Sequence, residues 1–194
     1  MRTVHCVLPN DIDDPARPSG GNIYDRRLIR GLTALGWTVI EHAVVGDWPD
    51  PGTAARQELA ARLAALPSGA VVLLDGLVAS AVPEILAREA DRLRLVILVH
   101  MPVGDAGGPV ARAREAEALQ TAVAVMTVSR WSRDRLVELG RQVVPVRRHL
   151  DGHEIRMGGV GLLRHARYCS APPERADLRL PRARGAHHTP SDTT

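Results

Sequence analysis

The chain has 194 residues, of which 45% are hydrophobic and 24% are charged. This length and composition are typical of one packed domain with a tail, and they exclude a wholly disordered chain. All 25 basic residues are Arg, which excludes enzymes that need a phosphate-binding or Schiff-base Lys. The cysteines, Cys6 and Cys169, are too few for a disulfide framework or a cysteine-based zinc site.

The net charge of +3 is unevenly distributed along the chain. Residues 1–146 hold 16 Arg and 17 acidic residues, whereas residues 147–194 hold 9 Arg and 5 acidic residues. Since the positive charge belongs to the C-terminal stretch, it gives little support to a nucleic-acid-binding fold. We therefore expect no nucleic-acid partner.

The sequence also argues against a membrane-spanning protein. A transmembrane helix needs roughly 20 consecutive apolar residues, and no stretch of this chain reaches that length. The apolar run after Arg2 ends at Pro9, too early for the apolar region of a secretory signal. We expect a cytoplasmic chain without a transmembrane segment.

The first part of the chain predicts a strand, a loop, a helix and a second strand. In that order they occupy Thr3–Leu8, Pro9–Gly21, Asn22–Leu35 and Thr38–His42. Within the helix, apolar side chains recur on one face at Tyr24, Leu28, Leu32 and Leu35. Gly36 follows where a left-handed glycine commonly ends a helix.

The alternation of helices and strands continues along the chain. The next predicted elements are a helix at Thr53–Leu66, a strand at Ala70–Leu74, a helix at Pro83–Arg92, a strand at Leu95–Val99, a helix at Val110–Ala122 and a strand at Ala124–Val128. Ser129 or Ser132 can cap a further helix that ends before Gly140, and Gln142–Val146 is a candidate sixth strand. Residues 147–194 show no sustained period and predict an irregular, disordered basic tail.

The strands are continuous apolar runs rather than alternating ones. Strand sequences are continuously apolar when helices cover both faces of a parallel sheet. The sequence therefore predicts an α/β fold with a Rossmann-like, doubly wound parallel sheet. We expect a single domain over residues 1–146, followed by the tail.

In such sheets, ligands bind beyond the carboxyl ends of the strands, where polar residues from several loops meet. The candidate binding or catalytic residues at those positions are Gly20, Gly21, Asn22, Asp75, His100, Ser129, Arg130 and Arg133. Each is a weak signal alone, because every strand must end in something polar. Their joint placement at one edge predicts a ligand site.

The glycine turn and the histidine carry the clearest chemistry. Gly20 and Gly21 let a ligand approach the free N–H groups of a helix start, where anions are favoured, or they form a plain helix-entry turn. His100 can donate a hydrogen bond to a sugar hydroxyl or move a proton near neutral pH. The alternative is a histidine that is hydrogen-bonded into its loop.

The other candidates have stronger structural explanations. Asp75 could orient a polyol, but we favour a cap of the turn that follows it. Arg130 and Arg133 could bind a phosphate, although solvated arginines on a helix are commoner. His187 and His188 lie side by side without a second set of ligands, so we expect no metal.

Four segments, in order, resemble the N-terminal domain of family 4 glycosyltransferases, which have the GT-B architecture. They are SGGNIYDRRLIRGLTALGWTV, VVLLDGLV, LVILVHMP and VMTVSRWSRDRLVELG. The resemblance covers about residues 2–146. The glycine loop with its helix and the VSRWSRDRL segment are its most specific parts, since the others are common in α/β sheets.

The resemblance implies an activity and roles for several residues. Members of that family transfer a sugar from a nucleotide sugar to an acceptor, here a sugar or a lipid-linked molecule, usually without a metal and with no other cofactor. Gly20 and Gly21 match the loop that approaches the donor phosphates, and His100 matches a catalytic-site histidine near the reacting sugar. The Ser129–Arg133 segment matches one that faces the cleft, and this domain mainly shapes the acceptor site.

The chain departs from the family after Val146. The family's donor-binding domain is not recognisable in residues 147–194, which look like translation of another reading frame. The hypothesis is a frameshifted or truncated transferase that is inactive alone and self-associates through an exposed cleft face. The alternative is a stand-alone Rossmann-like binding module with a basic tail. A Rossmann-like oxidoreductase is disfavoured because no G-x-G-x-x-G is present.

Overall fold

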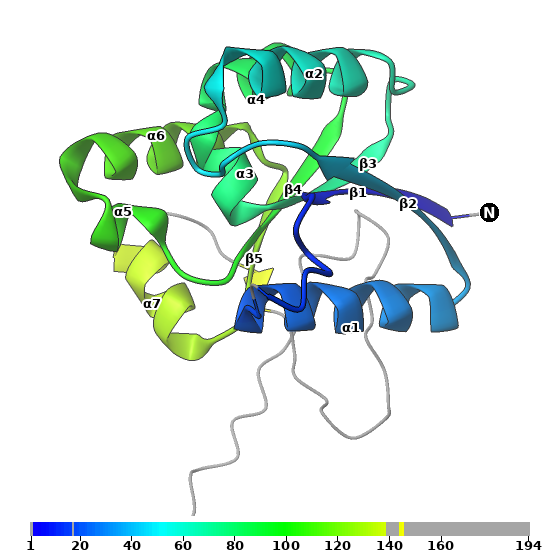
Figure 1. Cartoon of the computed structure of the whole chain (residues 1–194), viewed down its shortest axis with the longest axis horizontal. Coiled ribbons are helices and arrows are strands. Elements are labelled where there is room, and N and C mark those ends of the chain that lie inside the picture. The colour runs from blue at the N-terminus through cyan, green and yellow to red at the C-terminus, as the bar shows by residue number, and fades with distance from the viewer. Residues whose placement is uncertain (1, 17, 139–143, 146–194) are drawn as a thin grey trace, which may run out of the picture.

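A computed structural model describes residues 2–16, 18–138 and 144–145. Its centre is a six-stranded sheet in the order β2-β1-β3-β4-β5-β6, and all neighbouring strands pair in parallel (Figure 1). The strands are β1 (Arg2–Pro9), β2 (Trp37–Val44), β3 (Val71–Asp75), β4 (Arg94–Val99), β5 (Ala124–Thr127) and β6 (Val144–Pro145). The predicted α/β fold with a Rossmann-like parallel sheet is confirmed.

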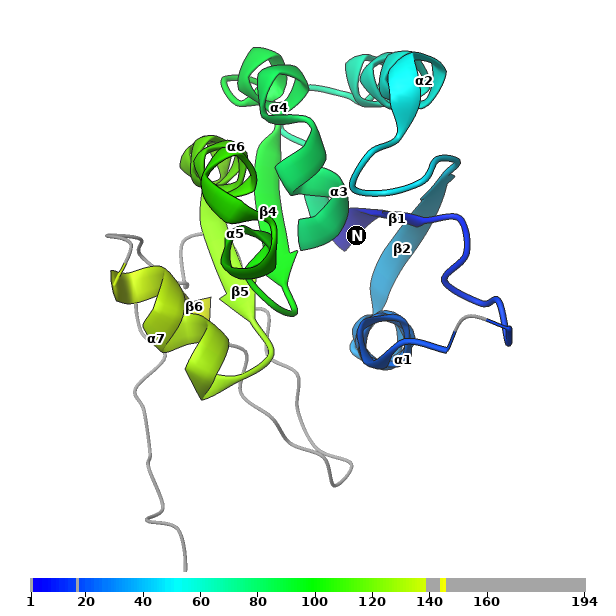
Figure 2. The same ribbon diagram turned by 60° about the vertical axis from the view of Figure 1, so that its left-hand side comes forward.

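Helices connect the strands and cover both faces of the sheet. They are α1 (Gly20–Ala34), α2 (Gly52–Ala64), α3 (Gly76–Ala81), α4 (Pro83–Glu89), α5 (Val103–Ala106), α6 (Gly108–Thr121) and α7 (Arg130–Glu138). Figures 1 and 2 show α1 on one face and α2, α3, α4 and α6 on the other. The sheet is therefore the middle layer of three.

The core lies in two apolar layers because side chains alternate along each buried strand. On one face, Leu73 and Leu98 pack with Leu28 and Leu32 of α1. On the other, alternate strand residues pack with α2, α3, α4, α6 and α7. Cys6 belongs to the α1 layer and is fully buried; burial first, then the nearby Glu41, raises the pKa of its thiol to about 12. It packs as a small hydrophobic residue.

The strand order reverses next to β1. From β1 the chain moves outward to β2, then returns to the other side for β3 and continues outward to β6. This reversal separates the loop after β1 from the loop after β3, which leaves room for a ligand at their carboxyl ends. The fold thus places α1 and the β3–α3 turn on either side of the switch point.

Some boundaries differ from the predicted ones. Helix α1 begins at Gly20, because the side chain of Ser19 caps it by accepting a hydrogen bond from the N–H of Gly21. Leu35 was predicted on the apolar face but is 43% exposed, since it lies past the last helical residue. Gly36 ends the helix with a φ of 80°, as predicted.

The short helices α3 and α5 fall in stretches for which no element was predicted. In the part of the chain that the structure describes, no helix is both long and apolar enough to cross a membrane. The predictions for Gly140 and for the tail of residues 147–194 lie outside the described residues.

Candidate functional site

His100 is the centre of a cluster at the carboxyl edge of the sheet. It directly follows β4, and it lies between the end of β3 and the first turns of α1. Its Nε2 atom is 2.9 Å from Oδ1 of Asp25 and 3.6 Å from Oδ2 of Asp75. The structure thus brings together loops that follow β1, β3 and β4, as the parallel topology predicts.

Both carboxylates of this cluster are buried. Asp25 is 2% exposed and Asp75 is 7% exposed, whereas the side chain of His100 keeps 20% of its surface in solvent. Buried carboxylates are stable only when charges or hydrogen bonds compensate them. His100 faces both carboxylates, and Asp75 is also compensated by two amides of α3.

The environment changes the proton affinity of each group. Burial, followed by the negative charge of Asp25, raises the pKa of Asp75 to about 6, although His100 and two helix amides oppose this. Burial lowers the pKa of His100, but the Asp25 hydrogen bond and the two carboxylate charges outweigh it, so the net change is upward. The cluster therefore favours a protonated imidazole.

Asp75 has two functions in this arrangement. Its Oδ1 accepts hydrogen bonds from the N–H groups of Leu77 (2.7 Å) and Val78 (3.3 Å), so it is the N-cap of α3. Its other oxygen, Oδ2, faces His100. The capping interpretation that we favoured is confirmed, and the same side chain also belongs to the histidine cluster.

The paired glycines at the start of α1 have different surroundings. A Cβ at Gly21 would lie 3.2 Å from Cδ2 of His100, so the absence of a side chain lets the imidazole pack against the helix. A Cβ at Gly20 would meet nothing within 4 Å. Gly20 therefore borders open space, where a ligand could approach the helix start. Tyr24 adds an edge-on ring contact to His100, with centroids 5.6 Å apart.

Two serines at the start of α7 fix the backbone beneath the histidine. The Ser132 hydroxyl donates to the carbonyl oxygen of His100 at 2.9 Å, and Ser132 is fully buried. Ser129, a predicted ligand residue, accepts a hydrogen bond from the Ser132 N–H at 3.0 Å and so caps α7. These bonds tie the β5–α7 turn to the β4 loop.

The predicted arginines of α7 are not part of the histidine cluster. Arg130 is exposed, and Arg133 is hydrogen-bonded through Nε to its neighbour Asp134 at 2.8 Å. They lie on α7 beyond the Ser129 turn. Their predicted role in phosphate binding therefore stays a prediction.

Glu115 of α6 holds the loop that follows His100. Its carboxylate accepts hydrogen bonds from the N–H groups of Val103 (2.8 Å) and Gly104 (3.0 Å), the first residues of α5. Glu115 is 2% exposed, and burial raises its pKa against the effect of these two amides. A buried carboxylate at this position fixes the course of the chain after β4.

Sequence reasoning missed Asp25 as a site residue. Its signal was a charged residue on a helix face that is otherwise apolar, because Asp25 shares the buried face of α1 with Leu28, Ile29 and Leu32. A carboxylate at such a position needs a buried partner. Only the fold shows that the partner is His100.

The cluster also has the donor atoms of a metal site. One atom each from Asp25, Asp75 and His100 lie within 4.8 Å of one another, and oxygen with imidazole nitrogen suits several divalent cations. An ion pair between His100 and Asp25, whose atoms are 2.9 Å apart, explains the same arrangement without a metal. The expectation of no metal stays a prediction.

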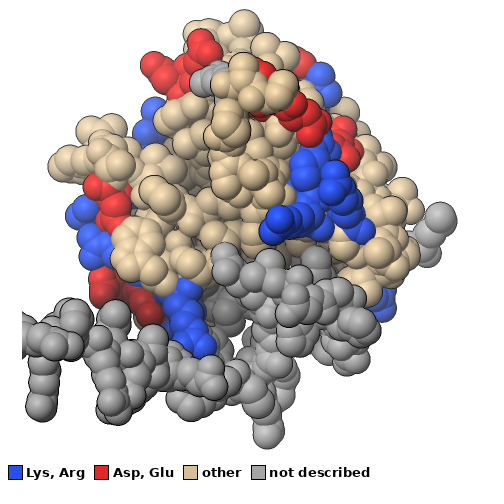
Figure 3. Space-filling model, turned by 60° about the horizontal axis from the view of Figure 1, so that its bottom comes forward, with Lys and Arg blue, Asp and Glu red and all other residues tan. Residues whose placement is uncertain are grey.

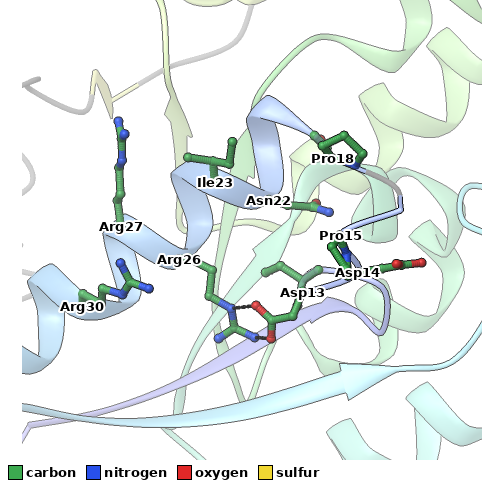
Figure 4. A pocket seen from close by; sticks show the side chains of 11 residues that line it. Asp13, Asp14, Pro15, Pro18, Asn22, Ile23, Arg26, Arg27 and Arg30 are labelled. Carbon is green, nitrogen blue, oxygen red and sulfur yellow. Dashed lines mark hydrogen bonds and ion pairs between the residues drawn. The ribbon is translucent and has the colours of Figure 1, made fainter.

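A separate groove lies beside the first turns of α1 (Figure 4). It has a volume of about 400 Å³ and is bounded by the loop before α1 and by α1 itself. Asn22, one of the predicted ligand residues, lines this groove rather than the histidine cluster. The two places share the first turn of the helix, since Gly21 packs on His100 and Asn22 borders the groove.

Comparison with protein-family models gives no match, and neither does comparison with curated proteins.

Proposed function

We propose that this domain is the acceptor-side half of a sugar transferase of the family 4 glycosyltransferase type, which moves a sugar from a nucleotide sugar to an acceptor. The observation that carries the proposal is His100, held at the carboxyl edge between the buried carboxylates of Asp25 and Asp75. The resemblance of the glycine loop and of the VSRWSRDRL segment supports the same assignment.

His100 would act as an oriented hydrogen-bond donor in this reaction. With Nε2 directed at Asp25, its Nδ1 remains to donate to an oxygen of the reacting sugar. The raised pKa keeps the imidazole protonated toward higher pH, and a charged donor binds a developing negative charge more strongly than a neutral one. Gly20 would give the donor phosphates close access to the helix start.

In a two-domain cleft, the second wall supplies the charges that neutralise the leaving diphosphate. We therefore propose that residues 2–138 bind the acceptor and position His100, and that turnover needs a donor-binding domain. The frameshift hypothesis names a source for it, which is another reading frame of the DNA that encodes residues 147–194.

The experiment is to read the other two frames of that DNA and to express the chain with the restored sequence. We expect the restored protein to transfer sugar from at least one nucleotide sugar in a panel, and the 194-residue chain to show negligible turnover. We expect His100→Ala in the restored protein to lower kcat by about 100-fold, the scale of a lost charged donor at the reacting centre.

Two results would refute the proposal. One is that neither frame encodes an α/β sequence with a basic and Glu-containing donor motif. The other is that a restored, folded protein shows the same kcat with and without His100. A matched control is His42→Ala, which removes a histidine that lies on β2 and stacks on His5 instead of joining the cluster.

A further inference from the structure

Two arginines on the outer face of α1 have no partner within the described part of the chain. Arg27 and Arg30 are exposed and three residues apart on α1, a spacing from which two long side chains can reach one ligand. Arg26, which precedes them on the helix, differs because it has partners. It is hydrogen-bonded to Asp13 at 2.6 Å and paired with Glu41 of β2.

These residues line the groove of about 400 Å³ beside α1. Figure 4 shows Arg27 and Arg30 along the helix at one end, and Asp13, Asp14 and Pro15 of the loop at the other. Figure 3 shows this side of the molecule, where blue arginine side chains gather beside red carboxylates. The groove therefore has a basic end and an acidic, polar end.

The charges at the loop end are already partly compensated. Arg26 neutralises Asp13, and one oxygen of Asp14 accepts the N–H of Ala16 at 2.8 Å. Asn22 makes only a long contact, 3.5 Å to the carbonyl oxygen of Asp11. The Asn22 amide and the second Asp14 oxygen are thus available to bind hydroxyl groups.

We propose that this groove binds a small phosphorylated sugar or polyol. Its phosphate would pair with Arg27 and Arg30, because guanidinium groups match phosphate oxygens in bidentate geometry. Its hydroxyls would bind Asn22 and Asp14 at the other end. The identification of this ligand as the acceptor rests on the proposed transferase function, since Asn22 and the His100-contacting Gly21 are neighbours in the same helical turn.

The experiment is calorimetric titration of the 194-residue chain with glucose 6-phosphate, and separately with glucose, inorganic phosphate and phosphatidylglycerol vesicles. The test variant is Arg27→Gln with Arg30→Gln. The control is Arg88→Gln, because Arg88 is also an exposed arginine, on α4, across the sheet from α1 (Figure 1). Circular dichroism of each variant checks that it is folded.

We expect glucose 6-phosphate to bind more tightly than glucose or inorganic phosphate. The double variant should weaken binding by about tenfold or more, as the loss of charged hydrogen bonds implies, while Arg88→Gln leaves it unchanged. Binding that survives in the folded double variant would overturn the proposal. So would no binding by the wild type, equal binding of inorganic phosphate, or a preference for vesicles.

This test is independent of the transferase assignment. His42→Ala should leave the binding of glucose 6-phosphate intact, because His42 stacks on His5 of β1 and does not line the groove. If the chain binds glucose 6-phosphate but the restored protein transfers no sugar, the groove proposal stands and the proposed transferase function is refuted. If the restored protein transfers sugar but the chain does not bind glucose 6-phosphate, the groove proposal alone is refuted.

Discussion

Asp25 raises the pKa of His100 and lies against its Nε2 atom. A carboxylate that is 2% exposed has lost most of its hydration, so a neutral partner would leave it strongly destabilised. Protonated His100 restores the balance and is itself oriented by the 2.9 Å contact. Asp75 faces the same nitrogen, at 3.6 Å, and strengthens the preference for the protonated form.

The paired glycines give a test of this packing. We expect Gly21→Ala to displace the imidazole from Asp25, because the new methyl group would lie 3.2 Å from Cδ2 of His100. Overpacking of this kind costs about 1–3 kcal/mol of the free energy of unfolding, and the pKa of His100 should fall. NMR titration of the ring Cε1 proton measures that pKa, and urea unfolding measures the stability.

Gly20→Ala is the matched control, because a Cβ there meets nothing within 4 Å. We expect an unchanged His100 pKa and a stability that is equal or slightly higher, since Ala is a better helix former than Gly. If the two variants show the same His100 pKa and the same stability, the missing side chain at Gly21 is not what allows the imidazole to pack there.

At the scale of elements, the sequence predicts long segments well and short ones poorly. Continuous apolar runs in the sequence predict β3 and β4. Gly36 indicates the end of α1, and Pro83 indicates the start of α4. Helices α3 and α5 have only 6 and 4 residues, too few for a helical period to show. Helix α3 is capped by the adjacent Asp75, and the start of α5 depends on a tertiary partner, the Glu115 carboxylate of α6.

Glu115 connects two elements and allows a second test. Glu115→Ala leaves the amides of Val103 and Gly104 without their acceptor, and the latter bond is buried. We expect the free energy of unfolding to fall by about 2–4 kcal/mol, the cost of unpaired buried groups. Hydrogen exchange at the Val103 and Gly104 amides should accelerate by more than the change in global stability explains.

Glu117→Ala is the control on the same helix, because Glu117 is exposed. It should change neither the unfolding free energy nor the exchange of the α5 amides. Equal losses in both variants would mean that the α6 helix is weakened generally, and that Glu115 has no specific role in holding the loop after His100.

At the scale of the whole molecule, the sequence predicts the parallel sheet and the edge at which the site lies. It does not predict which side chains meet at that edge. Parallel strands place Asp75 and His100 at one edge, which the chain order alone implies. That Asp25 reaches His100, while Asn22 turns to a different groove, depends on the rotation of α1 about its axis. Packing against Leu73 and Leu98 sets this rotation, and no local pattern specifies it.

The free energy of unfolding should depend on pH because the groups of the histidine cluster bind protons differently in the folded and unfolded states. Asp75 has a pKa of about 6 when folded and 3.8 when unfolded, so the folded state holds its proton more strongly. His100 also binds its proton more strongly when folded. Stability contributed by both groups is therefore greatest at low pH and is lost as the pH rises, through 3.8 to 6 for Asp75 and above 6.5 for His100.

Asp75→Asn isolates the first part of this effect, because the amide oxygen can still cap α3. From pH 4 to 7, the wild type should lose about 2 kcal/mol more of its free energy of unfolding than this variant does, because the remainder of the effect of a pKa change of about 2 units falls below pH 4. Urea unfolding at intervals across that range gives both curves. Asp91→Asn, at an exposed position, should follow the wild type. Parallel curves for wild type and Asp75→Asn would mean that Asp75 is ionised in the folded protein throughout, and that His100 and solvent compensate its charge more fully than the burial of the cluster indicates.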